Sequence, residues 1–208
     1  PHTGIYRIRV DHAYLGIQPS VFSSPTAGVA YRDLLARRFS EHAGSISGQR
    51  RGTGYSGVIT LDTPAQAILD RSAVVFTPDG VEVRFFIGLP AKGRRINGSL
   101  AQTMIFQELP AIVRQSLHAL APGEVEGHIH AAEDCEQLRD KLKGLGLVAF
   151  IADGSILPRR SGTSDKPLPT EETVVFRCPE SLRVSVELSH AGTVTGLGIP
   201  RGVTLIVG

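Results

Sequence analysis

The sequence has few of the features that mark membrane, secreted or disulfide-rich proteins. Its longest uninterrupted apolar run, LVAFIA at 147–152, is far shorter than the roughly 20 residues that span a membrane. Residues 1–10 alternate in polarity and lack the apolar centre of a secretory leader. The two cysteines, Cys135 and Cys178, lie in separate segments. They favour reduced thiols in an intracellular protein, and a single disulfide between them is the alternative.

An excess of one charge sign is also missing, since the formal net charge is only +2. An apolar share of 41% with 20% charged residues is ordinary for a globular protein and argues against disorder. The positive charge is nevertheless clustered in three Gly- or Pro-rich segments, where it predicts contacts with the phosphates of a nucleotide or a nucleic acid. The predicted contact residues are Arg50, Arg51, Lys92, Arg94, Arg95, Arg159, Arg160 and Ser161.

Polarity patterns predict a chain of alternating helices and strands. Helical spacing of apolar residues predicts helices over 29–43, 97–120 and 132–146, with Pro110 kinking or dividing the second. Alternating or β-branched runs predict the strands, and TPDG predicts a hairpin turn between two of them. The predicted strands are 5–11, 57–62, 67–76, 81–90, 147–152, 173–178, 182–188, 193–199 and 203–208.

The fold class that this order predicts is α/β, with α+β as the alternative. Composition changes at 153–172, which is turn-rich and charged and is the best candidate for a domain boundary. We therefore expect an N-terminal domain with a mixed sheet over 1–168. The antiparallel opening strands of a second domain follow over 169–208.

Metal and nucleophile chemistry find little support in the residues. His128, His130, Glu133, Asp134 and Cys135 lie together, but a polar loop leading into a helix explains them as well, and we predict no metal site. No serine or cysteine stands in a recognised nucleophile context, so no catalytic residue is predicted. The Asp11–His12 pair is either an acid/base pair or a structural feature at a strand end.

The three basic segments each have a simpler alternative. RRGTGYSG at 50–57 has the glycine density of a phosphate loop but lacks its lysine. LPAKGRR at 89–95 precedes a helix whose N-terminus favours anions, and a solvated loop is the alternative. DGSILPRRSGTSDKP at 153–167 combines arginines and hydroxyls, which suits anions, although a flexible linker would also have this composition.

Three later segments make the chain resemble a known family. GLVAFIADGSILPRRSGTSDKPL (146–168), VVFRCPESLRVSVEL (174–188) and GTVTGLGIPRGVTLIVG (192–208) closely resemble the predicted ATPases of the ABC class. This bacterial family has a relative among trypanosomatid mitochondrial RNA-editing factors. Earlier pieces also fit, among them GVEVRFFIGLPAKGRRI (80–96) and EDCEQLRDKL (133–142).

The resemblance implies an N-terminal α/β domain followed by an ABC-type ATPase core. GVTLIVG at 202–208 is similar to the strand that leads into a Walker A loop, so Gly208 matches the first glycine of that loop. The Walker lysine, the Walker B acid and the signature motif are then expected beyond residue 208. ATP and Mg²⁺ would bind in the full-length parent, and this part alone would not be catalytic. Phe176 lies where many ABC proteins stack an aromatic ring on adenine, and a buried strand residue is the alternative.

The same resemblance implies partners. RNA or another nucleic acid is expected on the basic loops, with the rest of the ATPase core and a second copy as further partners and no membrane. The expected location is the bacterial cytoplasm or the mitochondrion. Tyr55, Cys135 and the segment at 13–25 depart from the family pattern and leave the 50–57 loop without an inherited role. Two other hypotheses are a non-catalytic regulatory or docking module and a free-standing metal or thiol hydrolase.

Overall fold

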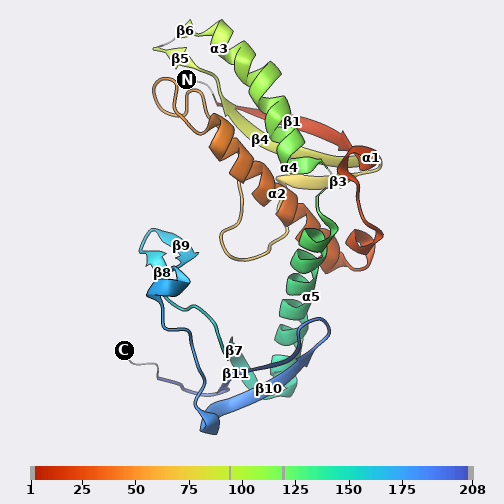
Figure 1. Ribbon diagram of the computed structural model, residues 1–208, viewed down its shortest axis with the longest axis vertical. Helices are drawn as coiled ribbons and strands as arrows, with labels where there is room; N and C mark the ends of the chain where they lie inside the picture. The colour runs from red at the N-terminus through yellow and green to blue at the C-terminus, as the bar shows by residue number, and fades with distance from the viewer. Residues whose placement is uncertain (1–2, 94, 119, 206–208) are drawn as a thin grey trace. The chain divides into compact units, whose positions relative to one another are not determined.

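The structure is a computed structural model that describes residues 3–93, 95–118 and 120–205 (Figure 1). The chain divides into two compact units, residues 1–129 and 130–208. The division falls inside helix α5 (Pro122–Gly144). The predicted domain boundary at 168/169 lies within the second of these units.

The first unit is built on an antiparallel sheet in the order β1–β4–β2, with β3 also paired to β4. The predicted hairpin is confirmed, because β3 and β4 pair directly across the TPDG turn. β1 pairs with β4 along its whole length, from Thr3 opposite Gly88 to Asp11 opposite Gly80. The strands are β1 (Thr3–Asp11), β2 (Ile59–Thr60), β3 (Val74–Thr77) and β4 (Gly80–Gly88), followed by the small hairpin of β5 (Ala91–Lys92) and β6 (Arg95–Ile96).

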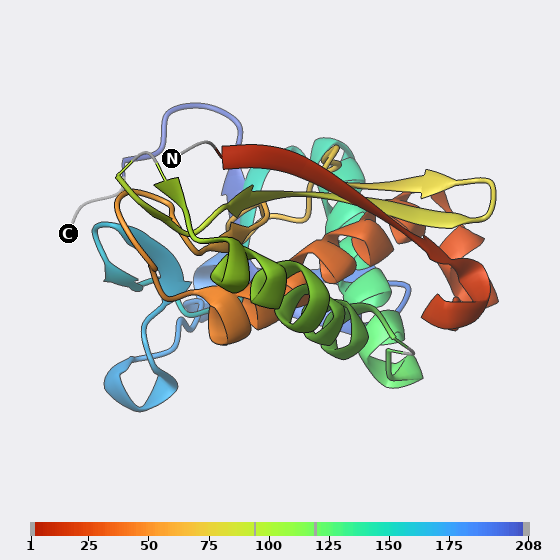
Figure 2. The ribbon, with the colours of Figure 1, turned by 90° about the horizontal axis from the view of Figure 1, so that it is seen from above.

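Helices cover one side of this sheet, as Figure 2 shows for α2 and the green helix that contains α4. The predicted helix at 29–43 is confirmed within α2, which begins earlier because Ser24 caps it: the Ser24 hydroxyl accepts the Ala27 N–H at 3.0 Å. The remaining helices of the unit are α1 (His12–Leu15), η1 (Pro19–Phe22), α3 (Gly98–Thr103), η2 (Met104–Glu108) and α4 (Leu109–Leu117).

The core of the first unit lies between α2 and the sheet. Phe39 of α2 packs against Phe85 of β4 with ring centroids 5.1 Å apart, and both are fully buried. Tyr31 stacks on Phe76 of β3, and burial raises the pKa of Tyr31 to about 12. Truncating a ring such as Phe39 to alanine removes about 3–5 kcal/mol of stability in comparable cores, so this packing fixes the sheet on α2.

The predicted helix at 97–120 is confirmed over 98–117, with a change of hydrogen bonding before Pro110. η2 is a π-helical segment, in which the Leu109 N–H donates to the Met104 carbonyl five residues back. Pro110 has no N–H and cannot continue the α-helical ladder from its own position. The π-helical turn directly before it lets the chain resume as α4 without a break.

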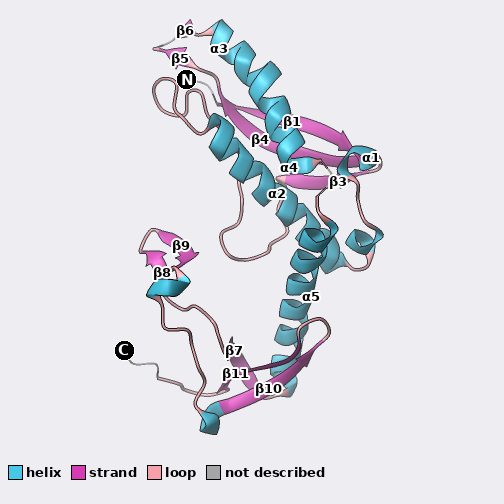
Figure 3. Cartoon of the chain, viewed as in Figure 1, coloured by secondary structure: helices cyan, strands magenta, loops and turns pink. Residues whose placement is uncertain are grey.

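The second unit contains the three-stranded antiparallel sheet β10–β11–β7 and the hairpin β8–β9 (Figure 3). The strands predicted at 147–152, 182–188 and 193–199 are confirmed here. Helices and strands occur in both units, so the predicted combination of α and β structure is confirmed. The predicted mixed sheet is not found among the described strands, because all of their pairings are antiparallel. The elements are β7 (Leu147–Ala152), β8 (Arg159–Ser161), β9 (Ser164–Pro167), η3 (Thr170–Glu172), η4 (Glu180–Leu182), β10 (Arg183–Leu188) and β11 (Gly192–Pro200).

Helix α5 corrects the prediction for residues 122–131. We expected a helix only from residue 132, but α5 begins at Pro122. Two glycines weaken the helix signal there, whereas Val125, Ile129 and Ala132 are buried at helical spacing and supply the apolar side. A proline also suits the first helical position, where its missing N–H has no intrahelical acceptor.

Four strand predictions are wrong over part or all of their length. Residues 173–178 form no strand, because only Phe176 exchanges backbone hydrogen bonds with the neighbouring 154–155 segment. The predicted strand at 57–62 shrinks to β2, and the predicted strand at 67–76 shrinks to β3, which begins only at Val74. Of the predicted buried strand at 203–208, residues 203–205 are exposed and irregular, and the remainder lies outside the described residues. Without a strand beside it among the described residues, an apolar run has no ladder to join.

Candidate nucleic-acid interface

The two arginines of the first basic cluster differ, because Arg51 forms an ion pair within the protein and Arg50 is exposed. Arg51 Nη1 lies 2.7 Å from Glu108 Oε1, and both side chains are largely buried, so this pair ties the loop to η2. Arg50 is exposed, and its guanidinium lies over the Tyr55 ring, 6.0 Å from the centroid. Of the two predicted contact residues, only Arg50 presents its charge to solvent.

The glycine loop at 50–57 lies against the end of β4. Gly57 N–H donates to the Gly88 carbonyl at 2.5 Å. A side chain on Gly52, whose φ is 144°, would meet the Ala91 carbonyl at 2.2 Å. Such close approaches need glycine. The glycine density therefore serves backbone packing here, and it brings this loop beside the β5–β6 hairpin.

The second basic cluster forms the β5–β6 hairpin at that same end of the sheet. Lys92 and Arg95 are opposite each other in the hairpin and are exposed, while Arg94 lies outside the described residues. Asn97 then caps α3, accepting the Leu100 N–H at 3.2 Å, which agrees with the predicted place of this cluster before a helix. Among the described residues, no ion pair involves Arg50, Lys92 or Arg95.

The third basic cluster belongs to the second unit. Arg159, Arg160 and Ser161 form β8 and are exposed. The register of β8 against β9 shifts between Arg159 and Ser161, so the regular alternation of a strand does not set the directions of the two arginine side chains. Ser161 Oγ lies 3.2 Å from Thr163 Oγ1 in the same hairpin. The structure thus brings the first two clusters together and leaves the third on its own hairpin.

Asp153, the first residue of the basic segment 153–167, has a structural role. Its carboxylate accepts the Cys178 N–H at 2.5 Å and the Thr195 hydroxyl at 2.9 Å, and Arg183 Nε lies 3.6 Å away. The backbone hydrogen bond from Cys178 is the main reason that the pKa of Asp153 lies below its ordinary value. These bonds hold the irregular 173–179 segment against the end of β7.

Of the two residues predicted to bind nucleotide, Phe176 lies within the described part of the chain and Gly208 does not. Phe176 is half-buried in that irregular segment, with its backbone N–H donating to the Ser155 carbonyl at 2.9 Å. Its expected role against adenine stays a prediction.

The 128–136 stretch has other partners on α5. His128 Nε2 lies 2.9 Å from Asp33 Oδ2 in the first unit. Burial alone would raise the pKa of Asp33, but hydrogen bonds from His128 and Arg37 outweigh it and hold that pKa below its ordinary value. In the second unit His130 stacks on His190 with centroids 3.9 Å apart. No group of three or more metal-binding side chains occurs within the part of the chain that the structure describes.

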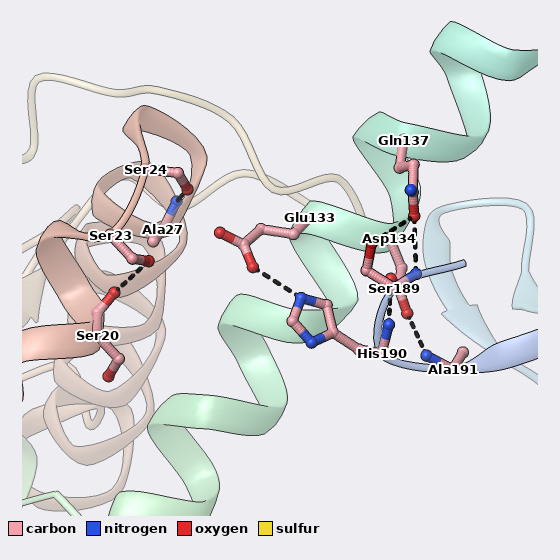
Figure 4. Close-up of polar contacts among 10 residues, drawn as sticks. All are labelled: Ser20, Ser23, Ser24, Ala27, Glu133, Asp134, Gln137, Ser189, His190 and Ala191. Carbon is pink, nitrogen blue, oxygen red and sulfur yellow. Dashed lines mark hydrogen bonds and ion pairs between the residues drawn. The ribbon is translucent and has the colours of Figure 1, made fainter.

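The polar residues that follow on α5 hold the β10–β11 turn (Figure 4). Both Asp134 carboxylate oxygens accept backbone N–H groups, from His190 at 3.0 Å and Ala191 at 2.7 Å. Gln137 accepts the Ser189 N–H at 2.8 Å, and Glu133 contacts His190 Nε2 at 2.8 Å. We call Glu133, Asp134, Gln137 and the turn Ser189–Ala191 the α5 clamp. Its side chains fix a turn, which explains them without a metal.

One charged group that the sequence reasoning missed lies on the sheet. Glu82 of β4 is buried among three arginines, Arg7 and Arg9 of β1 and Arg84 of β4, at N–O distances of 3.9, 3.1 and 2.9 Å. We call these four residues the Glu82 cluster. The alternation in IYRIRVD and VEVRFF placed the charges on one face of each strand. The pairing of β1 with β4, some 70 residues apart, was the missing information.

Comparisons with known proteins agree with this organisation. Residues 3–120 match the family model described as "ATPase of the ABC class N-terminal", and residues 122–208 match the P-loop domain of ABC ATPases. The first match covers more than half of the sequence. This chain belongs to the ATPases of the ABC class, and the change from one model to the next coincides with the start of α5.

A curated relative covers a smaller region. Uncharacterized protein MJ1628 of Methanocaldococcus jannaschii is 40% identical over 76 residues, which are 34% of this chain and 17% of that protein. The matched region is therefore a small part of a longer relative. Among the helices of the described residues, none combines the length and the apolar character required to cross a membrane.

Proposed function

We propose that this chain is the part of an ABC-class ATPase that holds RNA or another nucleic acid, through the exposed basic residues of its first unit. The observation that carries the proposal is the meeting of two basic loops at one end of the β1–β4 sheet. There Arg50, Lys92 and Arg95 are exposed and form no ion pair with a described residue. Unpaired cations on neighbouring loops suit a phosphate backbone, which carries one negative charge per nucleotide.

In the full-length protein we assign ATP and Mg²⁺ to the P-loop domain, to which residues 122–208 are similar. Phe176, which is half-buried, is the described residue that we assign to adenine. In the full-length protein, Phe176→Ala should then weaken ATP binding while Phe176→Tyr preserves it. Equal ATP affinity for both variants and the wild type would remove this role.

The test of the main proposal is RNA affinity measured against salt concentration. In the full-length protein, replacing Arg50, Lys92 and Arg95 together by alanine should weaken binding of a fluorescent single-stranded RNA. Each lost phosphate contact reduces the slope of log K against log salt by about 0.7 for single strands, so the slope should fall by about 2. Fluorescence anisotropy between 50 and 200 mM salt measures it.

A matched control changes the same charge elsewhere. Arg139, Lys143 and Arg201 are exposed residues of the second unit, and their triple alanine variant should leave the slope nearly unchanged. If both triple variants bind RNA like the wild type, the loops are not the interface. The regulatory or docking module would then be the better reading, and it predicts association with the separately expressed ATPase core without RNA binding.

A further inference from the structure

The face of the β1–β4 sheet that points away from the helices is open. In Figure 2 the helices α2 and α4 lie on one side of β1 and β4 only. Along β1 the burial pattern alternates, with Ile5, Arg7 and Arg9 exposed on the open side. The register sets Ile5 opposite Phe86, Arg7 opposite Arg84 and Arg9 opposite Glu82. Apolar and basic side chains therefore follow one another in rows across this face.

The basic part of this face has excess positive charge. Glu82 is only 5% exposed, whereas Arg7 and Arg9 are 64% and 76% exposed. Glu82 contacts Arg9 and Arg84 through their Nε atoms, so the outer nitrogens of those guanidinium groups are not used in these two contacts. The hydrogen bonds from Arg84 and Arg9 hold the pKa of Glu82 below its ordinary value, so it is ionised at neutral pH. Three guanidinium groups around one carboxylate leave a net charge of +2.

The apolar part of this face is an exposed aromatic platform. Phe86 is 38% exposed and Ile5 opposite it is 69% exposed. Thr60 of β2 flanks Phe86 on the other side. An aromatic ring left at the surface of a sheet beside arginines is suited to stacking with an unpaired base. The β5–β6 hairpin with Lys92 and Arg95 follows β4 at this end of the sheet (Figure 1).

At the edge of β1 the open face meets a groove of about 470 Å³ between β1 and the η2–α4 helix. Arg9 belongs to both the Glu82 cluster and the lining of this groove. The exposed residues Tyr14 and Arg114 also line this groove, and Asp11 contributes a carboxylate to the lining. Arginine and aromatic side chains are therefore present both on the open face and in the lining of the groove.

We propose that this open face binds single-stranded nucleic acid, with phosphates on Arg7, Arg9 and Arg84 and a base stacked on Phe86. The inference rests on the proposed function, because it assumes that a nucleic acid is the partner. It adds a second surface and specifies an unpaired strand, since the bases of a duplex are already stacked on one another. The excess positive charge complements phosphate, and the exposed ring distinguishes this surface from a purely electrostatic one.

The test compares two variants of the full-length protein. Arg7→Gln combined with Arg9→Gln removes two cations, and should reduce the salt slope for a 12-nucleotide single-stranded RNA by about 1.4. Phe86→Leu keeps an apolar side chain but no aromatic ring. It should weaken binding about 5-fold to 150-fold, the range for one stacked base, without changing the salt slope. Circular dichroism and the melting temperature confirm that each variant is folded.

Four probes separate the outcomes: the RNA, a DNA of the same sequence, the blunt RNA duplex and poly-glutamate. Weaker binding of the RNA by both variants, with the duplex bound less tightly by the wild type, supports the inference, whether or not the DNA binds equally. If both variants bind RNA like the wild type while the loop triple variant does not, the face is not an interface and the proposed function stands. If the wild type binds the duplex but no single strand, the inference is wrong and the proposed function stands, whereas binding of neither would show that both proposals are wrong. Tighter binding of poly-glutamate than of RNA would overturn the inference in favour of an acidic protein partner.

Discussion

The Glu82 cluster and the α5 clamp are both built from charged and polar side chains, but only the α5 clamp matches its charges to partners within the protein. In the α5 clamp, acidic and amide side chains are matched to backbone N–H groups and a histidine at hydrogen-bond distances. In the Glu82 cluster three cations share one buried carboxylate and remain partly exposed. The difference shows that the number of charged residues does not identify a binding surface. We therefore propose to recognise a candidate binding surface by the charge left over after the protein's own contacts are satisfied.

The largest effect should come from breaking the α5 clamp. Asp134→Ala removes two charged hydrogen bonds to the His190 and Ala191 N–H groups and should lower the free energy of unfolding by about 3 kcal/mol. Urea denaturation followed by circular dichroism measures this, and RNA affinity should not change. Asp140→Ala, an exposed carboxylate on the same helix, is the control and should cost under about 0.5 kcal/mol. Equal stabilities of the two variants would contradict the role of the clamp.

Asp33 is a second carboxylate with hydrogen-bond partners inside the protein, and its contribution to the free energy of unfolding should depend on pH. The pKa of Asp33 is lower in the folded state than in the unfolded state, where it is near 3.8. The ionised carboxylate therefore contributes its full stabilisation to the free energy of unfolding above that unfolded pKa. This stabilisation is lost as the pH falls through the lower folded pKa. Asp33→Asn should therefore lower the free energy of unfolding by about 2 kcal/mol at pH 7, with the difference shrinking below about pH 4. Urea titrations at several pH values check this, with exposed Asp62→Asn as the control. A difference that persists unchanged at pH 2 would contradict the assignment.

The adjacent Arg50 and Arg51 repeat the comparison inside one loop. Arg51→Ala breaks the pair with Glu108 and should cost about 1 kcal/mol of stability with RNA affinity unchanged. Arg50→Ala should leave stability unchanged and weaken RNA binding about threefold to fivefold, as expected for one phosphate contact. Anisotropy and urea denaturation of both variants give the two readouts. The reverse pattern would contradict the division between the exposed Arg50 and the ion-paired Arg51.

The smallest predicted effect is an increase in RNA affinity, whereas Arg50→Ala should decrease it. Glu82→Gln leaves the Glu82 cluster with three cations and no carboxylate, and should strengthen RNA binding about threefold while lowering stability. Glu41→Gln, an exposed carboxylate of α2, makes the same change of charge away from the sheet. RNA affinities of the two variants at 100 mM salt test the prediction. Weaker binding by folded Glu82→Gln would show that the carboxylate, not the excess charge, serves the ligand.

Local patterns predicted the local structure well. The alternation of 5–11 gave β1, the TPDG turn gave the β3–β4 hairpin, and the apolar spacing of 29–43 gave the centre of α2. The first ten residues of α5 were missed because two glycines weaken a helix signal that Val125 and Ile129 restore by burial. Burial against distant residues is a tertiary effect, and sequence spacing does not report it.

The candidate interface was predicted only in part, for the same reason. The basic loops were visible as composition, and Arg50, Lys92 and Arg95 are exposed as expected. The pairing of Arg51 with Glu108, 57 positions later, could not be read locally. Nor could the rows of the open face, which depend on the register between β1 and β4. A strand pattern shows which residues share a face, and only the fold shows what lies beside them.

The central claim is that exposed cations of the first unit bind a nucleic-acid backbone, and one slope tests it most directly. Six groups are assigned to phosphates in that unit: Arg7, Arg9, Arg50, Arg84, Lys92 and Arg95. For the full-length protein and single-stranded RNA, they predict a slope of log K against log salt of about −4. A slope near zero, or no measurable binding at 50 mM salt, would contradict the claim.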